Sequence, residues 1–105
     1  CDVEPSQDAR RTALEEAVRN EHIDLTRILL ENNNGYFLWY DYMAVYKHIA
    51  MKDNEELFRV LLEYLNENIT PSAITSLSEF GRYDYLNIFI EYCYNNNIII
   101  PSLYL

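Results

Sequence analysis

Residues 24–31 read DLTRILLE, and this pattern returns twice further along the chain. It returns as ELFRVLLE at residues 56–63 and, more loosely, as YLNIFIE at residues 85–91. With Ile28, Val60 and Ile88 taken as equivalent, the copies are 32 and 28 residues apart. Self-similarity at a period of roughly 30 residues is the sequence signature of a solenoid, in which one supersecondary unit is stacked on copies of itself.

The composition favours helices over strands. The 105 residues include only three Pro and two Gly. An all-β chain needs a turn former about every ten residues, so these numbers point to helices joined by short polar loops. Half of the residues are hydrophobic, which provides enough apolar area to offset the entropy of an ordered chain. We therefore expect one all-α domain.

Helical periodicity predicts six helices, which pair into three units. A lead-in covers residues 1–7, and an apolar tail covers residues 96–105. The predicted helices begin near residues 8 and 23, after the stretch 36–42, after Asn54, and near residues 71 and 83; they end near residues 19, 32, 51, 67, 79 and 95. The repeat domain, residues 8–95, divides into units at about 8–35, 40–67 and 70–95. Asn54 and Thr70, the latter followed by Pro71, are expected N-caps.

The second helix explains why the units must stack. Its apolar residues, Ile23, Leu25 and 28–30, cover more than one face. A helix that is apolar over much of its circumference needs neighbours on both sides, and a lone helix hairpin cannot provide them. The predicted fold is therefore a short solenoid of stacked antiparallel helix pairs.

The first unit, TALEEAVRNEHIDLTRILLE at residues 12–31, resembles an ankyrin repeat. That family's pattern opens on Thr-Pro-Leu-His, continues through Ala and Asn-Gly-His, and closes on three Leu. The residues in register with it are Thr12, Leu14, Ala17, Asn20, His22 and 28–30. Ala13, Glu15 and Glu21 stand where the family has Pro, His and Gly. The later units keep less of the pattern: Ala50, Leu57 and 60–62, then Ile74, Gly81 and 88–90.

The resemblance covers about residues 8–95 and implies stacked antiparallel helix pairs, with a concave face made by the first helix of each pair. It also implies protein–protein binding without enzymatic activity. The family's hairpin signature between repeats is missing from residues 34–41 and 66–72.

The aromatic stretch YFLWYDY at residues 36–42 is the predicted partner-binding site, and it lies where the family's inter-repeat finger would project. Tyr and Trp dominate interface energetics because they bring large contact area at low entropic cost. The residues expected to bind are Tyr36, Trp39, Tyr40, Asp41 and Tyr42, with Glu15 on the first-helix face. The four aromatic residues among them are expected to be exposed. In the alternative, Phe37, Leu38 and Trp39 fold inward between units one and two.

No pattern of catalytic, cofactor-binding or metal-binding residues is visible. Because His22 sits in a predicted turn and His48 lacks a ligand at helical spacing, no metal site is expected. Cys93 lies in an apolar helical pattern and is expected to be buried. A hydrolase that uses Cys93 or His48 would need a pocket that stacked hairpins seldom provide. We therefore expect a protein that is not an enzyme.

The formal net charge of −9 limits the class of partner. An acidic surface repels phosphate backbones and anionic lipid, so neither nucleic acid nor a membrane is expected. A protein partner with a basic surface is compatible. The alternative function is a small acidic helical inhibitor, or immunity-type protein, that blocks a basic surface of an enzyme.

Localisation follows from three negative signals. No apolar run approaches the roughly 20 residues that span a bilayer, residues 1–5 show no signal-peptide pattern, and two Cys are too few for a disulfide scaffold. Free thiols indicate a reducing compartment, and we expect the cytoplasm. The tail carries three consecutive Ile residues, 98–100, so it is expected to fold back on the last unit or to self-associate.

Overall fold

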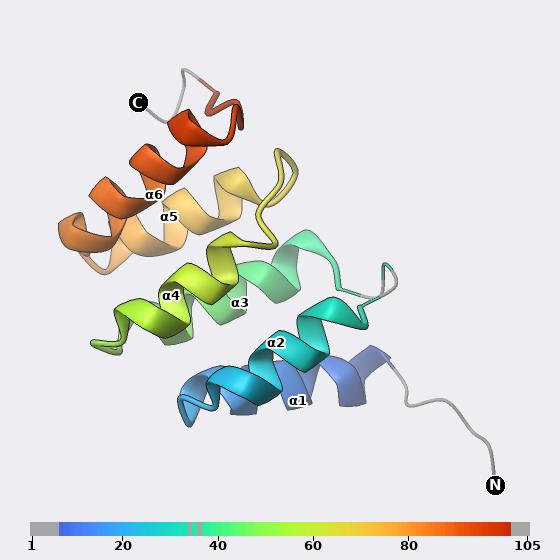
Figure 1. Ribbon diagram of the computed structural model, residues 1–105. Coiled ribbons are helices and arrows are strands. Elements are labelled where there is room, and N and C mark those ends of the chain that lie inside the picture. The colour runs from blue at the N-terminus through green and yellow to red at the C-terminus, as the bar shows by residue number, and fades with distance from the viewer. Residues whose placement is uncertain (1–6, 34, 36, 102–105) are drawn as a thin grey trace, which may run out of the picture.

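The computed structural model describes residues 7–33, 35 and 37–101, and these residues contain six α-helices and no strand (Figure 1). The helices are α1 (Gln7–Arg19), α2 (Ile23–Glu31), α3 (Trp39–Ala50), α4 (Glu55–Leu62), α5 (Thr70–Glu79) and α6 (Tyr83–Asn95). The all-helical prediction is confirmed for this part of the chain.

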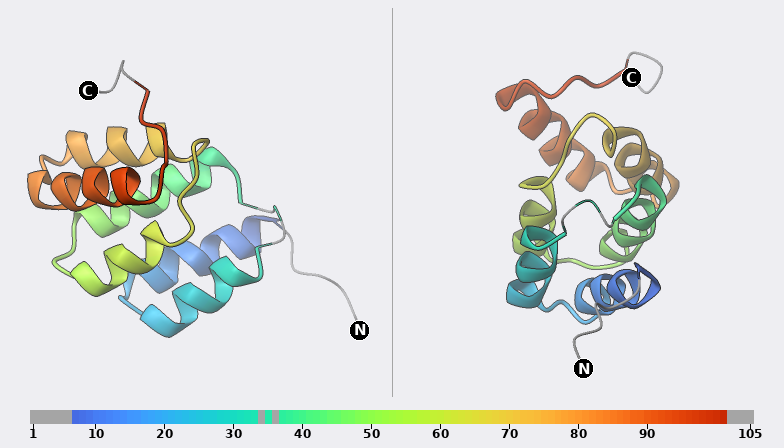
Figure 2. Two further views of the ribbon diagram at one scale, coloured as in Figure 1. Left: turned by 45° about the horizontal axis from the view of Figure 1, so that its top comes forward. Right: turned by 90° about the vertical axis from the view of Figure 1, so that its right-hand side faces the viewer.

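The helices lie in two layers, which Figure 2 shows most clearly in its right-hand view. Helices α1, α3 and α5 lie side by side in one layer, and α2, α4 and α6 in the other. Across the layers α1 packs on α2 and α5 packs on α6. The most extensive helix contact joins α3 and α5. Each layer is therefore made of every second helix, in the order in which they occur along the chain.

Small side chains explain the close approach of α3 and α5. The side of α5 that packs inward carries Ser72, Ala73 and Ser76, all buried. Helix separation depends on the side chains at the contact, and small ones let two backbones come near. The Ser76 hydroxyl donates to the carbonyl of Met43 at 3.1 Å, so this buried polar group is satisfied across the interface.

One core runs through both layers. At its centre the Phe58 ring stacks on Tyr85, with ring centroids 4.3 Å apart, and meets Tyr46 edge-on at 6.3 Å. Helix α4 lies in the middle of its layer, and its apolar residues are buried. Helix α2 lies at the end of that layer with α4 on one side only. Helix α2 still packs on both α1 and α4, as its apolar faces predicted, while Leu25 and Ile28 stay exposed.

Helix α4 ends at Leu62, five residues before the predicted boundary. Leu65 is buried and continues the apolar pattern, but its amide bonds to Leu62 three residues back. The side chain of Asn66 then accepts from the amides of Asn68 and Ile69 and makes a turn. The other predicted helix ends lie within one residue of the observed ones, as is usual for such boundaries.

The two predicted N-caps have different outcomes. Asn54 caps α4 as expected, because its Oδ1 accepts from the amide of Leu57 at 3.0 Å. Thr70 is instead the first residue of α5, and its hydroxyl donates back to the carbonyl of Asn66 at 2.9 Å. In the tail, Ile98 and Ile100 pack against the core while Ile99 is exposed. Self-association through the tail stays a prediction.

Candidate functional site

The connections between helices lie at two opposite edges of the molecule (Figure 1). We call one the turn edge: it holds the turns 20–22, 51–54 and 80–82. We call the other the loop edge: it holds the described residues of the connections 32–38 and 63–69 and of the segment 96–101. The two edges differ in how their polar groups are satisfied.

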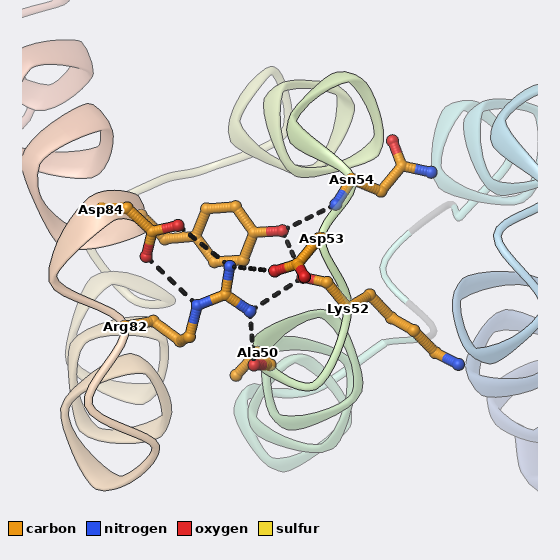
Figure 3. Close-up of polar contacts among 7 residues, drawn as sticks. Ala50, Lys52, Asp53, Asn54, Arg82 and Asp84 are labelled. Carbon is orange, nitrogen blue, oxygen red and sulfur yellow. Dashed lines mark hydrogen bonds and ion pairs between the residues drawn. The ribbon is translucent and has the colours of Figure 1, made fainter.

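At the turn edge, the guanidinium of Arg82 uses all of its donors (Figure 3). A guanidinium has five N–H donors in a planar fork. Here they are bound by the carbonyls of Ala50 and Lys52, both at 2.8 Å, by Asp53 at 3.0 Å, and twice by Asp84 at 3.0 and 3.1 Å. The guanidinium also lies 4.0 Å from the centroid of the Tyr85 ring. Arg82 is thus a joint between two turns, with no donor left for an external anion.

The hydroxyl of Tyr85 completes this joint. It accepts from the amide of Asn54 at 2.9 Å and donates to the carbonyl of Lys52. The hydrogen bond between Arg82 and Asp84 raises the pKa of the arginine and lowers the pKa of the carboxyl group. Both groups are therefore charged at neutral pH, which strengthens the bonds between them.

At the loop edge, two buried rings anchor the start of α3. Phe37 and Tyr42 meet edge-on with centroids 6.2 Å apart. Asn33 ties them together, since its Nδ2 donates to the Tyr42 hydroxyl at 3.0 Å and its Oδ1 accepts from the Phe37 amide at 2.7 Å. Burial raises the pKa of Tyr42. This part of the aromatic stretch is structural.

Asp41 fixes the first turn of α3. Its Oδ2 accepts from the amide of Leu38 at 2.8 Å, which is the carboxylate half of a capping box. The side chain is fully buried, and its Oδ1 lies 3.7 Å from Nε of Arg11 on α1. The negative charge also sits at the N-terminus of a helix, where the macrodipole favours it.

Between these two anchors in the sequence, the side chains of residues 38–40 are open to solvent. Trp39 is 58 % exposed, and Leu38 and Tyr40 are exposed as well. The Trp39 and Tyr40 rings meet edge-on at 5.5 Å. A pocket of about 510 Å³ lies beside Trp39, and its lining includes Phe37, Leu38, Trp39 and, from the α4–α5 connection, Asn66, Asn68 and Ile69. This pocket is the best-formed candidate site on the loop edge.

The aromatic stretch is therefore divided between the interior and the surface. Trp39 and Tyr40 are exposed as predicted, whereas the exposure predicted for Tyr42 is wrong. Asp41 is also inaccessible to a partner, because it serves the helix cap. Of the three residues that the alternative turned inward, only Phe37 is buried. Tyr36 lies outside the described residues.

The binding roles of Trp39, Tyr40 and Glu15 stay predictions. Glu15 is half-buried on α1 and does not line this pocket. Asn66, Asn68 and Ile69 line the pocket although no sequence pattern singled them out as site residues. A signal for them existed, because Asn34 and Asn66 are 32 residues apart, which is the spacing of the first two repeats. The repeat therefore extends into the connections and predicts that both lie at one edge.

Cys93 and His22, whose side chains are chemically reactive types, both lie in positions that serve the fold. Cys93 is buried, and burial raises the pKa of its thiol, which disfavours the reactive thiolate. His22 is the residue before α2, and its carbonyl accepts from the buried hydroxyl of Thr26 at 2.7 Å. Among the residues that the structure describes, no three His, Cys, Asp or Glu side chains gather where they could hold a metal ion. No helix in this described part has the length and apolarity to cross a membrane.

Comparison of the chain with protein-family models, with curated proteins and with solved structures gives no match.

Proposed function

We propose that the chain is an ankyrin-like solenoid of three stacked helix pairs that binds a protein partner and carries out no catalysis. The partner would contact the exposed aromatic residues of the loop edge and the face formed by α1, α3 and α5. The sequence period of roughly 30 residues and the order of helices within each layer support this architecture. The free thiol of Cys93 is compatible with the cytoplasm as the compartment.

One observation carries the proposal: Trp39 is exposed beside a pocket although the residues on either side of it are held in place. Asp41 caps the helix from which Trp39 projects, and Phe37 anchors the preceding chain in the core. An aromatic side chain on a rigid support loses little entropy when it is buried by a partner. Binding hot spots are enriched in Trp and Tyr.

A matched pair of variants tests the proposal. The double variant Trp39→Ala/Tyr40→Ala should lose partner capture from an extract of the source or host cells while its circular dichroism stays helical. The control is Tyr83→Ala/Tyr94→Ala, which removes two aromatic side chains that are 74 % and 84 % exposed on α6. The control should capture the same partner at the wild-type level. Equal capture by both double variants would contradict the assignment of the loop edge.

A second candidate function is the acidic inhibitor, and one feature of the turn edge favours it. A shallow pocket of about 610 Å³ lies between the starts of α2 and α4 and is lined by Glu21, Asp24, Glu56 and the exposed Leu25. Carboxylates around an apolar floor fit a Lys or Arg side chain of a basic enzyme surface. Salt separates the two functions. A charge-driven inhibitor loses affinity steeply as ionic strength rises, whereas an aromatic-anchored module loses little.

A further inference from the structure

The pocket beside Trp39 adjoins a second hollow on the loop edge. Asn66 and Asn68 line both of them. The second hollow has a volume of about 400 Å³, and its lining also includes Glu67, Asn97 and Ile98. The two hollows therefore form a track that crosses the loop edge from the start of α3, over the α4–α5 connection, to the segment after α6. We call this track the loop groove.

The first hollow of the loop groove suits an uncharged side chain. Its apolar walls come from Leu38, Trp39 and Ile69, and no Asp, Glu, Lys or Arg side chain is among its described lining residues. A charged group placed there would lose its hydration without gaining a partner of opposite charge. A Leu or Met side chain would instead exchange water contact for contact with the indole ring.

The middle of the loop groove offers side-chain amides. Asn66 uses its Oδ1 in the local turn, and its Nδ2 has no acceptor among the described residues. The exposed side chain of Asn68 likewise has no bonding partner in the described part of the chain. An amide both donates and accepts, as a peptide group does. Two amides that are two residues apart can therefore bond the backbone of an extended segment laid across them.

The far end of the loop groove is acidic. Glu67 is exposed and forms no ion pair with any described residue. The described lining of the second hollow contains no Lys or Arg. The chain as a whole carries a net charge of −9, which draws cationic groups and repels the phosphates of nucleic acid. A base could stack on Trp39, but its phosphates would then face this acidic surface.

We propose that the loop groove binds an extended peptide segment of the partner. An apolar side chain fills the hollow beside Trp39, the peptide backbone bonds the amides of Asn66 and Asn68, and a Lys or Arg a few residues along pairs with Glu67. This inference rests on the proposed function and states the chemistry of the segment that the partner presents.

The chain contains a built-in reporter for this interaction, because Trp39 is its only Trp. The probe is a set of short capped peptides in a Ser/Thr background, with Leu, Met or Asp at one position and Lys, Ser or Glu a varied number of residues later. Peptides with Leu or Met followed by Lys should shift the Trp39 emission saturably to shorter wavelength. Changing Lys to Glu in the best peptide should weaken binding about tenfold, since attraction becomes repulsion.

Two variants with the same charge change decide where the cation binds. Glu67→Lys should weaken binding of the best Lys-containing peptide about tenfold and improve binding of its Glu-containing counterpart. Glu91→Lys makes the same change on an exposed position of α6 and should alter binding less than about twofold, which is what screened long-range charge gives. Asn68→Ala should weaken both peptides about threefold to tenfold through the lost backbone bonds.

The inference is overturned if no peptide shifts the emission, if Asp-containing peptides bind best, or if Glu67→Lys and Glu91→Lys behave alike. These failures are separate from failure of the proposed function. If no peptide binds but Trp39→Ala/Tyr40→Ala still abolishes partner capture, the loop edge binds a folded surface and only the peptide inference falls. If that double variant also captures the partner normally, the proposed function falls with it.

Discussion

The turn edge and the loop edge consist of the same kind of chain, short connections between helices, but they satisfy their polar groups in opposite ways. At the turn edge every donor of Arg82 is bonded, and the Tyr85 hydroxyl both donates and accepts. At the loop edge Trp39 is exposed, and the amides of Asn66 and Asn68 keep unused bonding capacity. Satisfied groups hold helices together, whereas unsatisfied ones are available to a ligand.

The largest expected difference between the edges is in stability. Arg82→Ala removes five hydrogen bonds and leaves the carbonyls of Ala50 and Lys52 without this partner, so it should lower the free energy of unfolding by about 3 kcal/mol. Trp39→Ala at the loop edge should change it by less than about 0.5 kcal/mol, as an exposed substitution does. Urea unfolding followed by circular dichroism measures both.

Arg59→Ala is the control for loss of an arginine. Among the described residues, the Arg59 side chain bonds only Glu55 of the same helix, and both side chains are exposed, so its removal should leave the unfolding midpoint almost unchanged. A loss from Trp39→Ala as large as that from Arg82→Ala would remove the distinction between the two edges.

A pair of tyrosines gives a smaller contrast. Tyr85→Phe keeps the stacked ring but leaves the Asn54 amide unpaired and removes one of the two donors to the Lys52 carbonyl, which should cost about 1 to 2 kcal/mol of unfolding free energy. Tyr40→Phe at the loop edge removes an exposed hydroxyl that has no bond to the described residues, and it should be neutral. Thermal unfolding of the two single variants checks this, and equal shifts would contradict it.

The turns themselves offer a third test. Gly81 has φ = +65°, and Glu21 at the equivalent place in the first unit has φ = +58°. A Cβ on Gly81 would meet no atom within 4 Å, so Gly81→Ala should cost about 1 kcal/mol through backbone conformation alone. Glu21→Gly should raise the free energy of unfolding by up to about 1 kcal/mol, because Gly adopts a positive φ without strain. The lost hydrogen bond from Asn54 to the exposed Glu21 side chain offsets a small part of this gain. Destabilisation by Glu21→Gly would show that this bond outweighs the backbone strain.

The smallest expected effect is a pH dependence at the turn edge. The hydrogen bond from Arg82 lowers the pKa of Asp84 in the folded state, so the ionised carboxylate stabilises the fold above its unfolded pKa. This contribution is lost as the pH falls through the lowered folded pKa. Asp84→Asn should therefore be slightly less stable than wild type at pH 7 and equal to it in strong acid. The same difference at both pH values would show that ionisation of Asp84 does not contribute.

The periodic parts of this fold could be predicted from the sequence, and the connections could not. Apolar spacing places the helices because a buried helix face repeats every 3.6 residues. It misplaces the end of α4, where Leu65 continues the pattern although Asn66 has already turned the chain. The joint at Arg82 gives no repeat signal, because its equivalents in the other units are Asn54 and His22.

The aromatic stretch shows the same limit for the site. Its composition correctly marks an unusual segment, but composition does not state which rings point inward. The answer depends on where α3 begins: Asp41 lies in its first turn and caps it, which turns Tyr42 inward and leaves Trp39 outside. A helix start predicted at the correct residue would have assigned Asp41 to the cap.

Native-state hydrogen exchange, followed by NMR, tests most directly the claim that the turn edge holds the fold while the loop edge is available for binding. We predict that the amides of Asn54 and Arg82 exchange only through global unfolding, because the turn joint must break to expose them. The amides of Phe37 and Leu38 are held by side chains only four and three residues away in the chain, so they should exchange through local openings of lower free energy. Exchange at Asn54 and Arg82 that is as fast as at Phe37 and Leu38, or faster, would contradict the account.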